Sequence, residues 1–318
     1  MKSRGEVLDL FSGAGGFSFG FKEVGLKIRA AIEINSAATK SYKVNFPESI
    51  VIQEDIRNLG VKEVKELVGD VEVIIGGPPC EAFTGANPRR LKDPLERLYI
   101  DERGKLILEF IRFVGALKPK IFVMENVVSL MDREIKEAIK GEFSHLGYEE
   151  VYFNVLEASA LGNPSRRKRV FISNIEIEEP KATKKVSTCD AIKDLPPPSP
   201  DFPNHEYQEL PRKYMQKVTM LKQGQSLGWY KGYKRNIPIY KRLSCDDIAP
   251  TVMGNSRFIH PLEDRMLTVR EQARLMSYPD HFIFIGNKDE QYNQVGESVP
   301  PILAKYIAEI VMERLKDI

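Results

Sequence analysis

Short apolar runs alternate with helix-length amphipathic segments through the first half of this 318-residue chain. Runs rich in Val and Ile predict strands, because β-branched side chains favour extended backbone. We expect strands at residues 6–11, 28–34, 50–53, 71–75 and 121–124, and helices at 106–117 and 133–146. This alternation is typical of a doubly wound, mostly parallel sheet with helices on both faces. The predicted fold class is therefore α/β.

Three unusual segments each follow a predicted strand: the glycine-rich residues 12–16, the Gly-Gly-Pro-Pro-Cys of residues 76–80, and Glu125-Asn126. In doubly wound sheets, ligands bind at the carboxyl ends of the strands. The coincidence of the three segments therefore predicts one shared site at that edge of the sheet.

The pattern changes after about residue 174. Residues 178–202 are rich in Pro, Lys and Ser, which predicts an extended connection, and no helical period follows until about residue 260. A short helix with Thr268 as its N-cap is then expected at 268–276, and a longer one at 299–315. We predict a catalytic domain in two parts, 1–177 and 262–318, with a smaller target-recognition domain inserted at 178–261.

Composition sets broad limits: 42% of the residues are hydrophobic, 29% are charged, and the net charge is +2. This balance neither requires nor excludes a nucleic-acid partner, so DNA binding would need locally concentrated basic residues. No apolar run is long enough to suggest a membrane span. The four histidines lie far apart without ligand spacing, so no metal is expected.

The chain has three cysteines, Cys80, Cys189 and Cys245. They are too few and too scattered to predict a disulfide framework, which favours a reducing, cytoplasmic location. Cys80 follows two glycines and two prolines, and a thiol held in such a stiff, partly exposed loop can be reactive. Cys189 and Cys245 lack these surroundings and are expected to be small buried hydrophobic residues.

The glycine-rich segment Asp9-Leu-Phe-Ser-Gly-Ala-Gly-Gly follows the first predicted strand and precedes a helix. Glycines there allow a tight turn and a close approach to a ligand. Glu33 ends the second strand at the spacing typical of a carboxylate that holds a ribose. Asp55 follows the third strand, where it is placed to face an adenine amino group.

Six segments resemble, in order, the motifs of the DNA cytosine-5 methyltransferase family, and the likeness is to its prokaryotic restriction-modification type. They are Asp9-Leu-Phe-Ser-Gly-Ala-Gly-Gly, Gly77-Pro-Pro-Cys80, Glu125-Asn126-Val127, Ser165-Arg-Arg-Lys-Arg169, residues 267–279, and Gln294-Val-Gly-Glu-Ser-Val-Pro300. Matches cover almost the whole chain outside the middle segment, and six motifs in the family's order make a specific signal. The resemblance implies a Rossmann-like S-adenosylmethionine-dependent methyltransferase fold.

The resemblance also implies catalytic roles. Cys80 matches the nucleophile that adds to carbon 6 of cytosine, which makes carbon 5 able to accept a methyl group. Glu125 matches the carboxyl that shares a proton with ring N3. Arg167 and Arg169 match the arginines that hold the base's O2. Because these ring atoms are inaccessible inside a duplex, the target cytosine must be flipped out.

The cofactor implied by the resemblance is S-adenosylmethionine, with S-adenosylhomocysteine as its product. Phe11 resembles the residue that stacks on adenine, and Glu33 the residue that holds the ribose. The remaining residues expected to contact the cofactor are Gly13, Gly15, Gly16, Ile34, Asp55, Ile56, Pro78, Leu106, Ser298 and Val299.

Double-stranded DNA is the expected partner, with Arg89, Arg235, Arg242 and Arg257 as candidate contacts to phosphates or bases. A cognate restriction endonuclease acting on the same site is a further possible partner, outside this chain. We expect a monomer with no membrane association, located in the cytoplasm with the nucleoid.

Two residues depart from the family pattern: Glu81 stands where Gln is usual, and Glu297 where Asn is usual. The nearest alternative is an RNA cytosine-5 methyltransferase that acts on transfer RNA, with the same scaffold and chemistry. Its members resemble one another in a Cys-Phe-Thr triplet that the middle segment lacks. A catalytically silent DNA-binding subunit is disfavoured by the intact Cys80 and Glu125, and an oxidoreductase would leave Pro78-Pro79-Cys80 unexplained.

Overall fold

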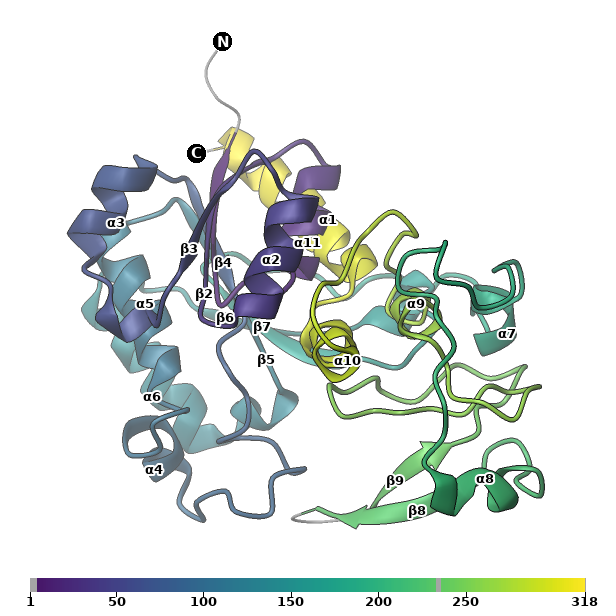
Figure 1. Cartoon of the computed structure of the whole chain (residues 1–318). Helices are drawn as coiled ribbons and strands as arrows, with labels where there is room; N and C mark the ends of the chain where they lie inside the picture. Colours follow the sequence, from purple (N-terminus) through teal and green to yellow (C-terminus); the bar gives the residue numbers. More distant parts are fainter. Residues whose placement is uncertain (1–4, 233–235, 318) are drawn as a thin grey trace.

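Residues 5–232 and 236–317 are described by a computed structural model, whose centre is a seven-stranded sheet in the order β3-β2-β1-β4-β5-β7-β6 (Figure 1). Its strands are β1 (Glu6–Leu10), β2 (Lys27–Glu33), β3 (Ile50–Gln53), β4 (Val73–Gly76), β5 (Ile121–Asn126), β6 (Tyr152–Glu157) and β7 (Lys168–Ser173). The first five strands are parallel, and β7 is antiparallel to both β5 and β6. The predicted α/β, mostly parallel fold is confirmed.

Helices cover both faces of this sheet (Figure 1). They are α1 (Gly16–Glu23), α2 (Ser36–Asn45), α3 (Val61–Val68), α4 (Pro94–Tyr99), α5 (Leu106–Leu117), α6 (Arg133–His145) and α11 (Pro301–Asp317). Successive residues of a strand point to opposite faces. Val7 of β1 accordingly belongs to one hydrophobic core and Leu8 to the other. The sheet therefore has two buried faces, as its near-continuous apolar strands require.

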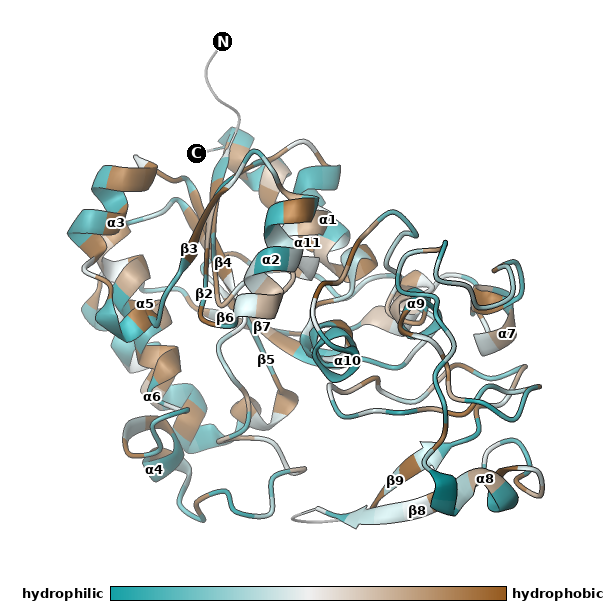
Figure 2. Cartoon of the chain, in the orientation of Figure 1, coloured by the Kyte–Doolittle hydropathy of each residue, from teal (hydrophilic) through white to brown (hydrophobic). Residues whose placement is uncertain are grey.

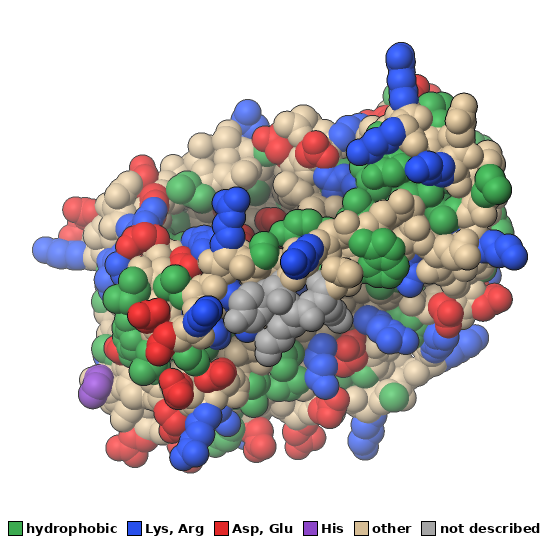
Figure 3. Space-filling view, turned by 90° about the horizontal axis from the view of Figure 1, so that it is seen from below, with side chains coloured by type: hydrophobic (Ala, Val, Ile, Leu, Met, Phe, Trp, Pro, Cys, Tyr) green, Lys and Arg blue, Asp and Glu red, His purple; other side chains and the backbone are tan. Residues whose placement is uncertain are grey.

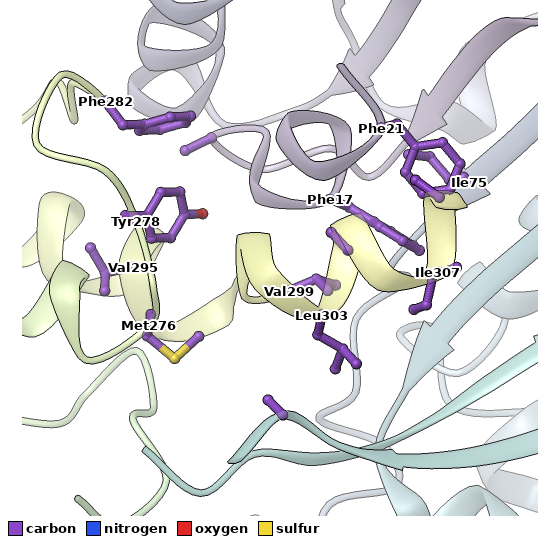
Figure 4. Packing of buried hydrophobic residues seen from close by; sticks show 14 of the residues in the cluster. Phe17, Phe21, Ile75, Met276, Tyr278, Phe282, Val295, Val299, Leu303 and Ile307 are labelled. Atoms are coloured by element: carbon purple, nitrogen blue, oxygen red, sulfur yellow. The ribbon is translucent and has the colours of Figure 1, made fainter. Parts of the chain in front are cut away.

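The C-terminal helix α11 completes one of these cores by packing on α1. Val299, Leu303 and Ile307 belong to the same buried cluster as Phe17 and Phe21, and Figure 4 shows them along this last segment of the chain. The approach is close at Gly20, where an added Cβ would lie 2.3 Å from the backbone nitrogen of Lys305. The end of the chain thus belongs to the same core as its beginning.

The middle of the chain forms a second lobe with little regular structure (Figure 1). It contains α7 (Thr188–Ile192), α8 (Arg212–Val218) and the antiparallel hairpin of β8 (Ser226–Lys231) and β9 (Asn236–Lys241), followed by α9 (Val269–Arg274) and α10 (Lys288–Glu297). Figure 2 shows that hydrophilic residues are frequent along α8 and α10. A small separate core supports the hairpin and consists of Leu210, Val218, Ile259 and Met266.

Local patterns predicted several elements well. The helix at 106–117 is α5, the strand at 50–53 is β3, and Thr268 caps α9 in a reciprocal capping box with Glu271. The helix expected at 299–315 begins two residues later, at Pro301. The sequence reading missed β6, β7, the hairpin β8–β9 and helix α10. No helix in the described part of the chain is both long and apolar enough to cross a membrane.

The expectation that Cys189 and Cys245 are unpaired hydrophobic residues is wrong, because the two form a disulfide. The bond joins α7 to the segment that follows β9, across 56 positions of the sequence. Backbone hydrogen bonds join the same segments, from Cys189 to Cys245 and from Thr188 to Asp247. The pairing was invisible in the sequence because it depends on a fold that brings the two distant segments together, and it removes one argument for a reducing compartment.

Removal of this disulfide is expected to destabilise the protein. A disulfide that closes a loop of this length lowers the conformational entropy of the unfolded chain, which stabilises the folded state by about 4 kcal/mol. The double variant Cys189→Ser/Cys245→Ser should therefore lose up to that amount of unfolding free energy in urea. Dithiothreitol should destabilise the wild type by a similar amount and leave the double variant unchanged. A wild type whose unfolding curve does not respond to the reductant would contradict the bond.

Candidate active site

The candidate site lies at one edge of the sheet, where β1, β4, β5 and β7 are neighbours. The glycine-rich turn follows β1, the Pro-Pro-Cys segment follows β4, and Glu125 is next to last in β5. Because β7 runs antiparallel to β5, its first residues lie beside the end of β5, with Asn126 opposite Val170. The fold thus brings the three segments singled out in the sequence to one place.

A tight turn holds Cys80. The Cys80 carbonyl accepts hydrogen bonds from the backbone N–H groups of Phe83 and Thr84, each at 2.9 Å. Ahead of the turn, the Asn126 side chain donates to the Pro78 carbonyl at 2.9 Å, which ties the Pro-Pro-Cys segment to β5. The thiol is free and only partly buried. It is therefore fixed in position yet open to a reactant.

Burial raises the pKa of the Cys80 thiol to about 11, and the negative charges of Glu81 and Glu125 contribute to the rise. The positive charges of Arg169 and Arg167 act in the opposite direction. Since only a thiolate is an effective nucleophile, the free protein keeps Cys80 protonated and unreactive near neutral pH.

Glu125 and Arg169 form an ion pair beside Cys80. The Glu125 carboxyl is buried, and its Oε1 lies 3.0 Å from Nε of Arg169. Its Oε2 lies close to Gly77, where an added Cβ would be 3.2 Å away. The Cys80 thiol, a carboxyl and a guanidinium therefore share one small region.

Arg167 has a different environment from Arg169. Its side chain is buried, and Nη1 donates to the carbonyls of Val252 at 3.0 Å and Gly296 at 2.9 Å. Burial, with the nearby charge of Arg169, lowers the pKa of the Arg167 guanidinium to about 9. Arg167 therefore connects the sheet to the middle segment and to α10, while Arg169 faces the carboxyl.

The glycine-rich turn is organised around Glu33. Its carboxylate accepts the backbone N–H of Gly13 at 2.8 Å and that of Asn35 at 2.7 Å, and burial raises its pKa. The chain is equally constrained at Gly16, where an added Cβ would lie 2.2 Å from the Tyr278 hydroxyl. The turn is therefore packed on one side against the C-terminal part of the chain.

Near this turn, Oδ1 of Asp9 and Oγ of Ser12 are buried and have no hydrogen-bond partner among the residues that the structure describes. Burial raises the pKa of Asp9 to about 7 although Ser18 donates to its other oxygen at 2.6 Å. Unpaired buried polar groups are costly and uncommon. Around Gly13, by contrast, a Cβ would meet nothing within 4 Å. Open space next to unsatisfied polar atoms suits a polar ligand.

The other predicted cofactor residues surround the same strand ends. Ile34 directly follows β2 and is 63% exposed, Ile56 is buried, and Asp55 receives three hydrogen bonds from the Arg57 side chain. The remaining ones lie at element boundaries: Phe11 and Gly15 in the turn after β1, Pro78 after β4, Leu106 at the start of α5, and Ser298 and Val299 between α10 and α11. No set of three His, Cys, Asp or Glu within residues 5–232 and 236–317 is arranged to hold a metal.

The four arginines predicted to contact DNA differ in exposure and in their partners. Arg242 is a correction: it is buried and bonded to the carbonyls of Val218, His260 and Glu263, and it pairs with Asp264, so it stabilises the lobe. The second, Arg257, has a 15% exposed side chain that pairs with Asp289 and leaves little surface for DNA. Only Arg89 is freely exposed, and Arg235 lies outside the described residues.

Arg89 lines a cleft of about 690 Å³ between the segment after Cys80 and the hairpin of the second lobe. The other residues that line the cleft, none of which was predicted as a DNA contact, are Asn87, Pro88, Arg103, Trp229, Tyr230 and Lys231. In the sequence, Trp229 stands among basic residues at 229–241, a combination typical of a nucleic-acid surface. Its large sequence separation from Cys80 hid the fact that this segment lines the same cleft as residues 87–89.

Comparison with known proteins gives a consistent result. Residues 5–313 match the family model for C-5 cytosine-specific DNA methylase. A Methanocaldococcus jannaschii protein that bears the name of a type II methyltransferase, M.MJ0563P, is 46% identical over 97% of this chain and 99% of its own length. Type II methyltransferase M1.HphI of Haemophilus parahaemolyticus is 36% identical over 96% of this chain and 86% of its own. A prophage-encoded DNA modification methyltransferase of Escherichia coli has a similar structure, with a TM-score of 0.78, 26% identity and coverage of 98% and 99%.

The raised pKa of Cys80 predicts slow alkylation in the free protein. With a pKa of about 11, about one thiol in ten thousand is ionised at pH 7. The rate with iodoacetamide should rise about tenfold for each pH unit between 7 and 10. Glu81→Gln removes a charge that raises this pKa, so it should speed alkylation at pH 8, whereas Glu102→Gln should not. Mass spectrometry would follow the label on Cys80, and a rate that levels off below pH 9 would refute the assignment.

Proposed function

Because the chain belongs to the C-5 cytosine-specific DNA methylase family, we propose that it methylates carbon 5 of a cytosine flipped out of double-stranded DNA, with Cys80 as the covalent nucleophile. As a member of this family it is a DNA cytosine-5 methyltransferase and uses S-adenosylmethionine. The proposed roles of the residues rest mainly on one observation: Cys80, Glu125 and Arg169 lie close together at the ends of adjoining strands.

The residues around the glycine-rich turn fit the cofactor. Unpaired oxygens of Asp9 and Ser12 next to the open space at Gly13 suit the charged amino-acid end of S-adenosylmethionine. Glu33 would hold the ribose hydroxyls with the lone pairs that its two backbone hydrogen bonds leave free. The rest of the pocket would be formed by Phe11, Gly15, Gly16, Ile34, Asp55, Ile56, Pro78, Leu106, Ser298 and Val299. When bound, the cofactor supplies a methyl group on a positively charged sulfur.

In the proposed reaction, the Cys80 thiolate forms a bond to carbon 6 of the flipped cytosine, and the ring electrons move towards N3 and carbon 5. Glu125 would share a proton with N3, and its position beside Cys80 supports this role. Once carbon 5 carries the methyl group, it loses its proton to a base, and the carbon–sulfur bond breaks to return the thiolate. The ring thus gains the thiolate and the methyl group and then loses the carbon 5 proton and the thiolate, so Cys80 is regenerated.

The two arginines are proposed to have different roles. Arg169 is paired with Glu125 in a mostly buried contact and would donate to O2 of the base, where negative charge develops. Arg167 is bound to two backbone carbonyls, so it would act mainly by holding the middle segment and α10 in place around the site. Together their charges favour the thiolate of Cys80.

The charge balance around Cys80 suggests how the enzyme becomes active only with substrate. Two carboxylates, Glu81 and Glu125, oppose ionisation of the thiol in the free protein. If the proton that leaves the Cys80 thiol is shared between Glu125 and N3 of a bound cytosine, the negative charge of Glu125 no longer opposes the thiolate. The pKa of Cys80 would then fall at the moment when a base is present to receive it.

For the rest of the molecule, we propose that residues 178–261 form the target-recognition domain and that 1–177 and 262–318 form the catalytic domain. Arg89 lines the cleft between them and remains a proposed DNA contact. The relatives named as type II methyltransferases support a place in a restriction-modification system, with a separate endonuclease as partner. We propose a monomer that acts in the cytoplasm, where DNA is accessible.

The alternative substrate, transfer RNA, has less support. The family model describes DNA methylases, and the similar solved structure from Escherichia coli is that of a DNA modification methyltransferase. Since the chemistry would be the same on either nucleic acid, only a substrate comparison separates them.

The decisive test uses labelled S-adenosylmethionine with duplex DNA, duplex DNA that contains 5-fluorocytosine, and bulk transfer RNA. Methyl label should enter the DNA only. The fluorinated duplex should form an adduct that survives denaturation, because fluorine cannot leave carbon 5 as a proton does. Cys80→Ala should abolish both turnover and adduct while cofactor binding persists. Label on RNA alone would overturn the substrate, and an adduct in Cys80→Ala would overturn the nucleophile.

Glu125→Gln tests the proton-sharing role. Loss of a positioned acid should slow the single-turnover rate by about 10²- to 10⁴-fold. DNA affinity should change much less, because the carboxyl is buried beside Arg169. The matched control is Glu134→Gln, at the exposed start of α6. Rapid-quench measurements would decide, and an unchanged rate for Glu125→Gln would contradict the proposed role.

A further inference from the structure

Trp229 is the only tryptophan of the chain, and its side chain is 65% exposed on β8. Large aromatic residues bury much apolar surface when they can, so an exposed one on a lobe with its own core calls for a partner. Trp229 and Lys231 lie two residues apart and so share one face of the strand. Both line the cleft described above.

The opposite wall of this cleft is formed by the segment that follows Cys80 and by Arg103. It contains Asn87, Arg89 and Arg103. The Asn87 side chain donates to the backbone carbonyl of Glu81 at 2.9 Å, and the charge of Glu81 acts on Arg103. The wall that faces Trp229 is thus attached to the residue that follows the nucleophile.

The charges of the cleft are those of a nucleic-acid groove. Arg89, Arg103 and Lys231 line it from both sides, and Figure 3 shows Lys and Arg side chains along the hollow at this end of the molecule. Positively charged groups that flank an exposed aromatic ring are the usual arrangement for holding phosphates while a base stacks on the ring.

We propose that Trp229 stacks on a base of the substrate DNA next to the target cytosine, while Arg89 and Lys231 contact the phosphates on either side. Arg103 is paired with Asp101 and contributes to the wall of the cleft. This inference rests on the proposed function and assigns a positioning residue to it. Stacking would offset part of the cost of unstacking the target base. The hairpin therefore takes part in presenting the cytosine to Cys80.

The experiment uses the intrinsic fluorescence of the wild-type protein, which reports on Trp229 alone because the chain has no other tryptophan. A duplex with the sequence that the enzyme methylates, found by mapping methylated sites in genomic DNA, is titrated in. Stacking should quench the emission in parallel with binding measured by anisotropy of labelled DNA. Heparin, which offers charge without bases, should bind with little quenching. Emission unchanged by saturating DNA would overturn the proposal.

Variants supply the functional readout. Trp229→Ala should weaken DNA binding or slow methylation by roughly 5- to 150-fold. Trp229→Phe keeps a ring and should restore much of this loss, while the KM for the cofactor stays the same in both. Tyr207→Ala removes another exposed aromatic outside the cleft and should behave as wild type. Thermal unfolding would confirm that each variant is folded.

Phosphate contacts can be detected by the salt dependence of DNA affinity. Arg89→Ala should reduce the slope of log affinity against log salt by about one. An unchanged slope would remove Arg89 from the proposed contacts.

The outcomes separate the two proposals. If the wild type fails to methylate DNA and forms no adduct with the fluorinated duplex, the proposed function is wrong whatever Trp229 does. If it methylates DNA and Trp229→Ala does so at the wild-type rate and affinity, the function stands and the stacking role is overturned.

Discussion

The structure depends on the buried guanidinium of Arg167, which joins three parts of the chain that are far apart in sequence. From just before β7 it donates to the carbonyls of Val252 and Gly296, in the middle segment and at the end of α10. A buried charge without partners is strongly unfavourable, so these contacts must form together. Because Arg169 lies two residues further on, the same contacts help to hold the guanidinium that pairs with Glu125.

The sequence predicted what local patterns determine. Apolar β-branched runs located β1 to β5, and the glycines, Cys80 and Glu125 were placed correctly at their ends. Pairings across long sequence distances were not predictable in this way. The antiparallel insertion of β7 between β5 and β6, and the bond between Cys189 and Cys245, exist only once the chain is folded. Arg242 shows the same limit: in sequence it looks like a surface cation, but its side chain is buried, bonded to three backbone carbonyls and paired with Asp264.

The charges around Cys80 illustrate how a protein can hold a thiol in its unreactive form. Burial and two neighbouring carboxylates favour the thiol, while two arginines favour the thiolate. The balance lies on the side of the thiol in the free protein, which protects it from oxidation and alkylation. A change in the charge of one neighbour is enough to shift this balance, so substrate binding and activation can be the same event.

The disulfide described above has a consequence for how such a chain can change over evolutionary time. Cys189 and Cys245 close a ring of chain that contains α8 and the β8–β9 hairpin, and Leu210 and Val218 within the ring belong to a small core of their own. Substitutions, insertions or a wholesale exchange inside the ring leave its two ends held at a fixed separation. Changes within the ring therefore leave the sheet and the strand ends outside it in place.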